Sequence, residues 1–208
     1  MVTTMYVVCV GGAAFALFFL YDLNSVLWKN RLLHGSFTLG CLLLLAATAG
    51  DLWIAWPGNG LLHPVRLVCL TAAAICLALL VYTLFFALPF DETYRQSQDE
   101  GRHVCDRGMY ALCRHPGILW FFLLYLLLGL AMTPSPLLYH GLFYSLCNFL
   151  YAVFQDLWTF PRTFCDYRQY QLKTPFFFLL PPAFAGPWKQ AGRPGGPYEI
   201  SGKDKRIQ

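Results

Sequence analysis

Long apolar segments alternate with shorter polar ones along most of this chain, and five apolar runs stand out. They cover residues 4–21, 36–56, 65–90, 117–132 and 137–154. An α-helix needs ~20 apolar residues to cross the hydrocarbon core of a bilayer, and four of the runs come close to or exceed that length. The fourth run, with 16 residues, is slightly short for a crossing. The pattern predicts an all-α fold, a polytopic membrane helical bundle with about five transmembrane helices.

The connection between the fourth and fifth runs is only Thr-Pro-Ser-Pro, residues 133–136. So short a connection makes the two helices antiparallel neighbours. The start of the fourth helix must then lie level with the end of the fifth. Arg114 and His115 are therefore expected beside Gln155 and Asp156.

Residues 157–173 mix aromatic and charged side chains, a composition that favours a C-terminal helix in the membrane interface. The following tail is rich in Gly, Pro and Lys and is predicted to be disordered. Three regions result. Residues 1–90 hold three transmembrane helices, residues 91–182 hold a cytoplasmic loop, the helical hairpin and the interfacial segment, and residues 183–208 form the tail.

Composition and charge support the membrane interpretation. The chain is 57% hydrophobic and only 12% charged, far more apolar than a soluble domain. Its net charge of +4 does not indicate a nucleic-acid partner, because the basic residues lie between and after the apolar runs. The polar segments 22–35, 91–116 and 155–208 hold two, four and eight of the 15 Lys and Arg residues, whereas the opposite side holds only Arg66. The positive-inside rule then predicts an outside N-terminus and a cytoplasmic C-terminus.

The eight cysteines lie mostly in apolar runs and form no C-x-x-C pair, so their spacing predicts neither a metal site nor a disulfide framework. Asp51, near the end of the second run, is a candidate functional carboxylate. Its closeness to the interface favours a solvated or snorkelling side chain instead.

The fourth run is preceded by a polar stretch that contains candidate functional residues. It covers residues 108–117 (Gly-Met-Tyr-Ala-Leu-Cys-Arg-His-Pro-Gly). Pro116 disfavours helical backbone at His115, so we expect an extended Arg-His pair followed by a helix that begins near Pro116. The first N–H groups of a helix lack intrahelical partners and carry the positive end of its dipole. With Arg114 beside them, they would form a binding site for an anionic group at the membrane surface.

These residues resemble the Gly-x-Tyr-x-x-x-Arg-His-Pro signature of the isoprenylcysteine carboxyl methyltransferase and phospholipid methyltransferase superfamily. Gln155-Asp156 stands where that family usually has a Glu-Glu pair, and residues 164–170 with Thr174-Pro175 resemble its C-terminal pattern. The resemblance covers about residues 104–182. It implies a membrane enzyme that binds S-adenosylmethionine at the cytoplasmic face and methylates a lipophilic acceptor, such as an isoprenylcysteine carboxylate or a phospholipid amine, in contact with membrane lipids.

The same resemblance implies the site residues. The catalytic group would be Arg114, Gln155 and Asp156. Residues in contact with S-adenosylmethionine would be Tyr110, Arg114, His115, Pro116, Gly117, Tyr167 and Tyr170. Methyl transfer from a sulfonium depends more on alignment than on acid–base chemistry, so a water-poor pocket that orients both reactants would suffice.

The chain departs from the family pattern at four positions: Ile118 replaces a Tyr, Trp120 and Cys165 each replace a Gly, and Gln155 replaces a Glu. Two alternatives from other classes stay open: an NADPH-dependent membrane reductase of the sterol type, and an inactive membrane scaffold. At the level of residues, Asp156 could be solvated or paired with Arg162, and Tyr167 and Tyr170 could be aromatic residues of the interface belt.

Overall fold

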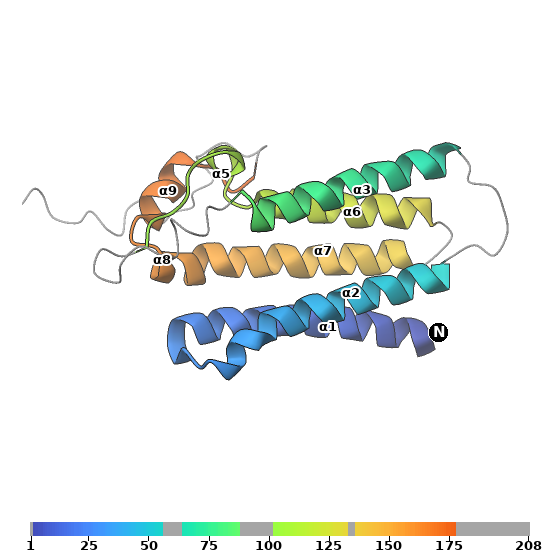
Figure 1. Cartoon of the computed structure of the whole chain (residues 1–208), viewed down its shortest axis with the longest axis horizontal. Coiled ribbons are helices and arrows are strands. Elements are labelled where there is room, and N and C mark those ends of the chain that lie inside the picture. Colours follow the sequence, from blue (N-terminus) through green and yellow to red (C-terminus); the bar gives the residue numbers. More distant parts are fainter. Residues whose placement is uncertain (1, 56–63, 88–101, 133–135, 178–208) are drawn as a thin grey trace, which may run out of the picture.

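The protein is an elongated bundle of lengthwise helices with shorter helices gathered at one end (Figure 1). The computed structural model describes residues 2–55, 64–87, 102–132 and 136–177. Within these ranges the regular elements are helices, and the β-structure is one isolated parallel bridge between Arg102 and Phe164. The predicted all-α bundle is confirmed.

Five long helices match the five apolar runs. They are α1 (Val2–Leu23), α2 (Gly35–Ala55), α3 (Pro64–Phe85), α6 (Pro116–Ala131) and α7 (Leu137–Phe154). Four continuous helical stretches are long and apolar enough to cross a membrane: Thr4–Trp28, Leu32–Ala55, Pro64–Phe85 and Leu137–Thr163. Helix α6 has 16 residues and, at ~1.5 Å per residue, reaches about 24 Å, less than the ~30 Å of a hydrocarbon core.

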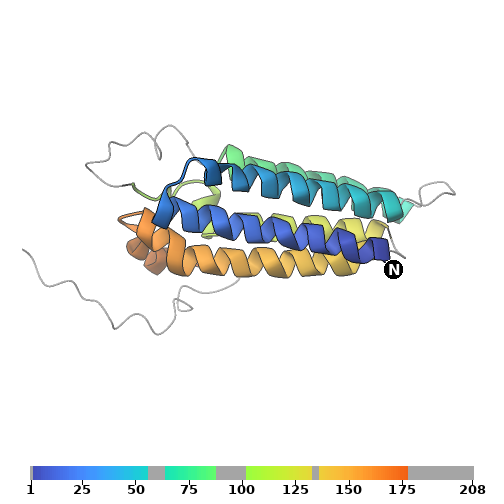
Figure 2. The same ribbon diagram turned by 90° about the horizontal axis from the view of Figure 1, so that it is seen from below.

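The helices pack both with neighbours in the sequence and with helices far away in it. Helix α3 packs on α6, α6 on α7, α7 on α1, and α1 on α2, so α7 lies in the middle of the bundle, between α6 and α1 (Figures 1 and 2). Aromatic residues fill the core, among them Phe15, Phe18, Phe121, Tyr125 and Tyr144. Only 17–39% of the residues in an apolar 18-residue portion of each spanning stretch are buried inside the protein. The remaining apolar surface needs a lipid environment, so the chain is a membrane protein.

Short elements cap one end of the bundle. A π-helical turn, Asn24–Trp28, extends α1, and the 3-10 turn Leu32–His34 leads into α2. A second π-helical turn, Gln155–Thr159, extends α7 and is followed by α8 (Phe160–Thr163) and α9 (Tyr167–Lys173). Helix α5 (Met109–Leu112) lies at the same end (Figure 1). The segment expected at the interface is thus helical in two short pieces.

The interpretation of Asp51 as a solvated residue is wrong. Its side chain is completely buried, and its Oδ1 lies 2.7 Å from Nδ1 of His140. The last turns of α2 pack against the first turns of α7, and this contact encloses the carboxylate between two helices. The predicted third run also extends beyond the helix, which ends at Phe85. Residues 88–101 and the predicted disordered tail lie outside the described residues.

Candidate functional site

Helix α6 begins at Pro116 as predicted, and the residue before it is non-helical, but the expected extended Arg-His pair is not formed, because His115 is not extended. Cys113 is extended, with φ −155° and ψ 157°, and His115 is non-helical, with φ −128° and ψ 61°. Pro116 occupies the first turn of α6, where its missing N–H costs nothing. The Arg114 N–H donates to the carbonyl of Pro175 at 2.9 Å. The motif is therefore tied to the chain segment that follows α9.

Gly108 begins this local structure. Its φ of +61° lies in the left-handed region that favours glycine, and no neighbouring atom occupies the space of a Cβ. The backbone, rather than a close contact, explains a glycine at this position. The turn at Gly108 starts α5, which carries Tyr110 toward the bundle.

Asp156 is the centre of the site. It lies on the π-helical turn after α7 and is only 4% exposed. One of its oxygens, Oδ1, is 3.1 Å from Nε of Arg114 and 3.3 Å from Nε2 of His115. The predicted convergence of the start of the fourth helix with the end of the fifth is confirmed.

Helix α9 completes the surroundings of this carboxylate. The Tyr167 hydroxyl donates to Oδ1 of Asp156 at 2.6 Å. The Gln171 amide donates to Oδ2 at 3.1 Å and to the backbone carbonyl of Asp156 at 2.9 Å. Arg114, His115, Asp156, Tyr167 and Gln171 thus form one buried group, which we call the Asp156 cluster. Both carboxylate oxygens have partners, so Asp156 is suited to hold its neighbours in place rather than to accept a substrate proton.

The alternative interpretations of Asp156 and the tyrosines are wrong. Asp156 is not solvated, and Arg162 instead donates to the carbonyl of Trp158 at 2.9 Å and covers the Trp158 ring. Tyr167 and Tyr170 are buried and are not belt residues. Arg114, expected at the membrane surface, is also buried, because Phe176 covers its guanidinium at 5.7 Å.

Aromatic rings control the charge of His115. Its ring stacks on Phe160 at 5.8 Å and contacts Phe176 at 4.7 Å. This burial lowers the pKa of His115 below its usual 6.5, and although Asp156 opposes the shift, Arg114 adds to it. The imidazole is neutral at pH 7 and can donate one hydrogen bond to Asp156. Burial, reinforced by the Asp156 charge, raises the pKa of Tyr167, which stays protonated as a donor.

The other predicted site residues differ in whether they contact the Asp156 cluster. Tyr110 is adjacent: its hydroxyl donates to the carbonyl of Thr83, and its own carbonyl accepts the Tyr170 hydroxyl. Gln155 is not part of the cluster, because its side chain hydrogen-bonds to Asp22 of α1. Gly117 faces α3, where a Cβ would meet the Leu80 and Leu84 side chains at 3.6 and 3.8 Å.

Sequence reasoning missed three contributors, Gln171, Phe160 and Phe176. A single glutamine on a short polar helix gives no distinctive pattern. Two phenylalanines in a chain that contains many of them do not stand out either. Only the predicted proximity of the interfacial segment to Asp156 could have indicated them.

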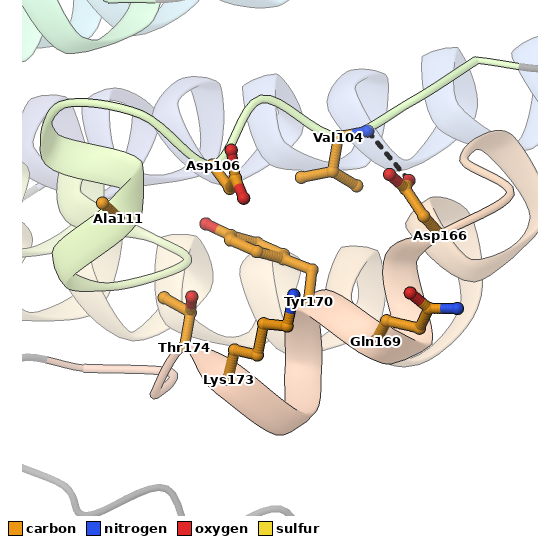
Figure 3. Close-up of a pocket in the computed structure, with 8 residues that line it drawn as sticks. All are labelled: Val104, Asp106, Ala111, Asp166, Gln169, Tyr170, Lys173 and Thr174. Carbon is orange, nitrogen blue, oxygen red and sulfur yellow. Dashed lines mark hydrogen bonds between the residues drawn. The ribbon is translucent and has the colours of Figure 1, made fainter.

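A polar cavity of about 270 Å³ opens beside the cluster (Figure 3). It is lined by Val104, Asp106, Ala111, Asp166, Gln169, Tyr170, Lys173 and Thr174. Its volume is just below the ~300–1,000 Å³ typical of small-molecule sites. The Tyr170 ring lines the cavity, while its hydroxyl holds Tyr110. This residue therefore connects the cavity to the motif.

Two buried donors of the motif region make no hydrogen bond within the described part of the chain. They are the Arg114 Nε–H, which is close to Asp156 but poorly aligned, and the Trp120 indole N–H. Buried donors are normally satisfied, so an acceptor from outside the chain would improve this arrangement.

No family model, curated protein or solved structure matches this chain. The methyltransferase resemblance therefore depends on the residues of the 104–182 region and on how the structure arranges them.

Proposed function

We propose that the protein is an integral membrane methyltransferase that uses S-adenosylmethionine and acts on a lipophilic acceptor. The observation that supports this proposal is the Asp156 cluster. Arg114 and His115 come from one half of the motif and Asp156 from the other, 41 residues beyond His115. All three are buried together at one end of a membrane bundle, beside a polar cavity.

The residues present fit such a cofactor. S-adenosylmethionine carries a carboxylate, an ammonium and an adenosine, and these require cationic donors, acidic acceptors and aromatic walls. Arg114 has a buried Nε–H without a hydrogen bond, and the cavity offers the Asp106 carboxylate and the Tyr170 ring. When bound, the cofactor supplies an electrophilic methyl group on sulfur.

The chain would contribute orientation and exclusion of water. Asp156 and Gln171 hold Arg114 and the start of α6 in fixed positions, and Phe160 and Phe176 shield the cluster. Such preorganisation can supply much of the barrier reduction for a transfer that needs in-line alignment. The acceptor is proposed to be lipophilic because the surrounding helices expose apolar side chains, through which it would approach from the bilayer.

A scaffold without catalytic activity is the second candidate. This candidate is favoured because both carboxylate oxygens of Asp156 already have partners within the protein. The cluster is therefore complete without a ligand. The methyltransferase family that this chain resembles has glycines at the positions of Trp120 and Cys165. These two replacements also favour a scaffold without catalytic activity.

The first prediction tests Arg114. Arg114→Lys keeps the charge but loses the planar, forked donor, and we expect S-adenosylmethionine binding to weaken by about 1.5–3 kcal/mol, roughly tenfold or more. Isothermal titration of purified protein in detergent measures the affinity. Arg162→Lys is the matched control, because it makes the same change at the same end outside the cluster.

The outcomes separate the candidates. Equal affinity in Arg114→Lys and the parent, with unchanged melting temperatures, would remove Arg114 from the cofactor site. Binding of NADPH in place of S-adenosylmethionine would indicate a reductase. Absence of binding by the parent, together with no transfer of a labelled methyl group into a lipid extract, would leave the scaffold.

A further inference from the structure

A second group of chemically reactive side chains lies at the same end of the bundle, outside the Asp156 cluster. It consists of His103, Cys165 and Asp166. The Nδ1 atom of His103 is 3.4 Å from Sγ of Cys165 and 3.1 Å from Oδ2 of Asp166. One potential ligand atom from each residue lies within 4.8 Å of the other two. An imidazole nitrogen, a thiol sulfur and a carboxylate oxygen therefore converge on one small volume.

Backbone contacts hold these three residues in register. The parallel bridge joins Arg102 to Phe164, and the Cys165 N–H donates to the carbonyl of Arg102 at 2.9 Å. The Val104 N–H donates to Oδ1 of Asp166, also at 2.9 Å (Figure 3). This bond leaves the other carboxylate oxygen, Oδ2, directed at His103. The convergence is a consequence of paired backbone segments and not of one flexible side chain.

The two separations from His103 Nδ1 are close to those around a tetrahedral zinc ion. With Zn–S of ~2.3 Å, Zn–N of ~2.05 Å and Zn–O of ~2.1 Å, tetrahedral angles place S and N about 3.6 Å apart and N and O about 3.4 Å apart. The observed 3.4 and 3.1 Å are within a few tenths of an ångström of these values. Nitrogen, thiolate and carboxylate are the three ligand types that zinc uses in proteins.

We propose that His103, Cys165 and Asp166 bind a zinc ion, with water as the fourth ligand. On binding, the S–H bond of Cys165 breaks, its proton leaves to solvent, and an S–Zn bond forms, so the affinity should rise with pH. The hydrogen bond from the Val104 N–H to Asp166 orients one ligand from behind, as hydrogen bonds to the ligands of zinc sites commonly do. The side chains of His103 and Asp166 are 50% and 34% exposed, which gives the ion a route of entry.

The ion would clamp two walls of the polar cavity. Val104 and Asp166 both line that cavity, and Asp166 immediately precedes α9, which carries Tyr167 and Tyr170. Zinc would fasten the segment that leads into α5 to the start of α9. The cysteine spacing could not predict this site, since His103 and Cys165 are 62 residues apart.

Zinc content tests the proposal without any cofactor or acceptor. Full-length protein is purified in detergent without chelators, its zinc is measured by mass spectrometry, and the affinity is measured by competition with a chromophoric chelator. We expect about one zinc per chain. His103→Ala, Cys165→Ser and Asp166→Asn should each lose most of it. Cys105→Ser, in the same segment but outside the group, should retain it.

Binding of cobalt gives a second measurement. Its result would differ if the three residues had only a structural role and bound no metal. Cobalt bound to a thiolate has a sulfur-to-metal charge-transfer band near the ultraviolet, and this band should be present in the parent and absent in Cys165→Ser. Chelation should lower the melting temperature of the parent and leave that of Cys165→Ser unchanged. A parent that holds no zinc would overturn the proposal, and so would zinc that remains equally tight in Cys165→Ser.

Discussion

Buried carboxylates are the residues that distinguish this molecule from a simple apolar bundle. Asp22, Asp51 and Asp156 are each almost fully enclosed, and each is paired with a group from a distant element. Asp22 accepts from Thr159, Asp51 contacts His140, and Asp156 contacts Arg114. A carboxylate in an apolar interior is costly unless it is paired, so these contacts fix which elements must lie together.

His115 provides the clearest prediction from pH. Its folded-state pKa is below the value near 6.5 expected for the unfolded chain, so below pH 6.5 the unfolded state binds a proton that the folded state does not. Folding stability should therefore fall as the pH decreases through that window, by up to ~1.4 kcal/mol per pH unit. Melting temperatures in detergent at pH 7.5 and 5.5 should differ less in His115→Gln than in the parent.

The exposed His34 is the control for this measurement. His34→Gln should keep the parental difference in melting temperature between the two pH values, because this exposed residue lies outside the Asp156 cluster. If His115→Gln keeps the parental difference in melting temperature between the two pH values, the buried imidazole does not contribute to the pH dependence of stability.

The sequence indicated some of these residue contacts and not others. The proximity of Arg114 and His115 to Asp156 followed from a four-residue connection, which leaves two helices little freedom. The Asp51–His140 contact joins α2 to α7, helices far apart in the sequence, so no local length constraint applies. The direction of Gln155 toward Asp22 depends on the π-helical turn, which rotates the residues after Phe154 in a way that no composition signal predicts.

At the scale of helices, small residues determine how closely the bundle packs. A Cβ at Gly129 would lie 2.7 Å from Cα of Leu138, and one at Gly141 would lie 2.8 Å from Cβ of Tyr125. A Cβ at Gly11 would overlap the Tyr144 ring, whose hydroxyl donates to Val7 of α1. Close approach through glycine is a common way for helices to associate in membranes, where the hydrophobic effect contributes little.

Gly129→Ala tests this close packing of α6 against α7. The added methyl group meets backbone, which cannot rotate away, so we expect a loss of about 1–3 kcal/mol in stability. Gly50→Ala is the matched control, since its Cβ would lie an ordinary 3.5 Å from Val7. Thermal melting in detergent should show a clear decrease for Gly129→Ala and no decrease for Gly50→Ala. Equal melting temperatures would mean that the two helices are not in such close contact.

The positions of the helices along the chain followed from the apolar pattern more readily than their exact ends did. All five predicted runs form helices, because each run is uniformly apolar and bounded by polar or Pro-rich segments. The ends are less predictable: α1 and α7 both continue as π-helical turns into sequences that contain Asn24 and Asp156. In the sequence, polar residues at those points predict that the helices end. In the structure these polar residues are buried and have hydrogen-bond partners, so the helices continue.

At the scale of the whole molecule, the two ends of the bundle differ in chemistry. The capped end holds the Asp156 cluster, the polar cavity and the proposed zinc ligands, together with most of the basic residues that the structure describes: Lys29, Arg31, Arg102, Arg107, Arg114, Arg162, Arg168 and Lys173. The opposite end has Arg66 among the described residues. Such an asymmetry predicts that the capped end faces the cytoplasm, where S-adenosylmethionine and zinc would both be accessible.

Labelling from one side of the membrane tests this orientation. Tyr139, in the first turn of α7, is 74% exposed at the end opposite the cluster, and Leu172 of α9 is 56% exposed at the capped end. If the basic end is cytoplasmic, a thiol reagent that cannot cross membranes should label Tyr139→Cys in intact cells and Leu172→Cys only after permeabilisation. The parent, with its own eight cysteines, gives the background for both conditions. The reverse pattern would place the Asp156 cluster outside, away from a cytosolic cofactor, and would remove the topological support for the methyltransferase proposal.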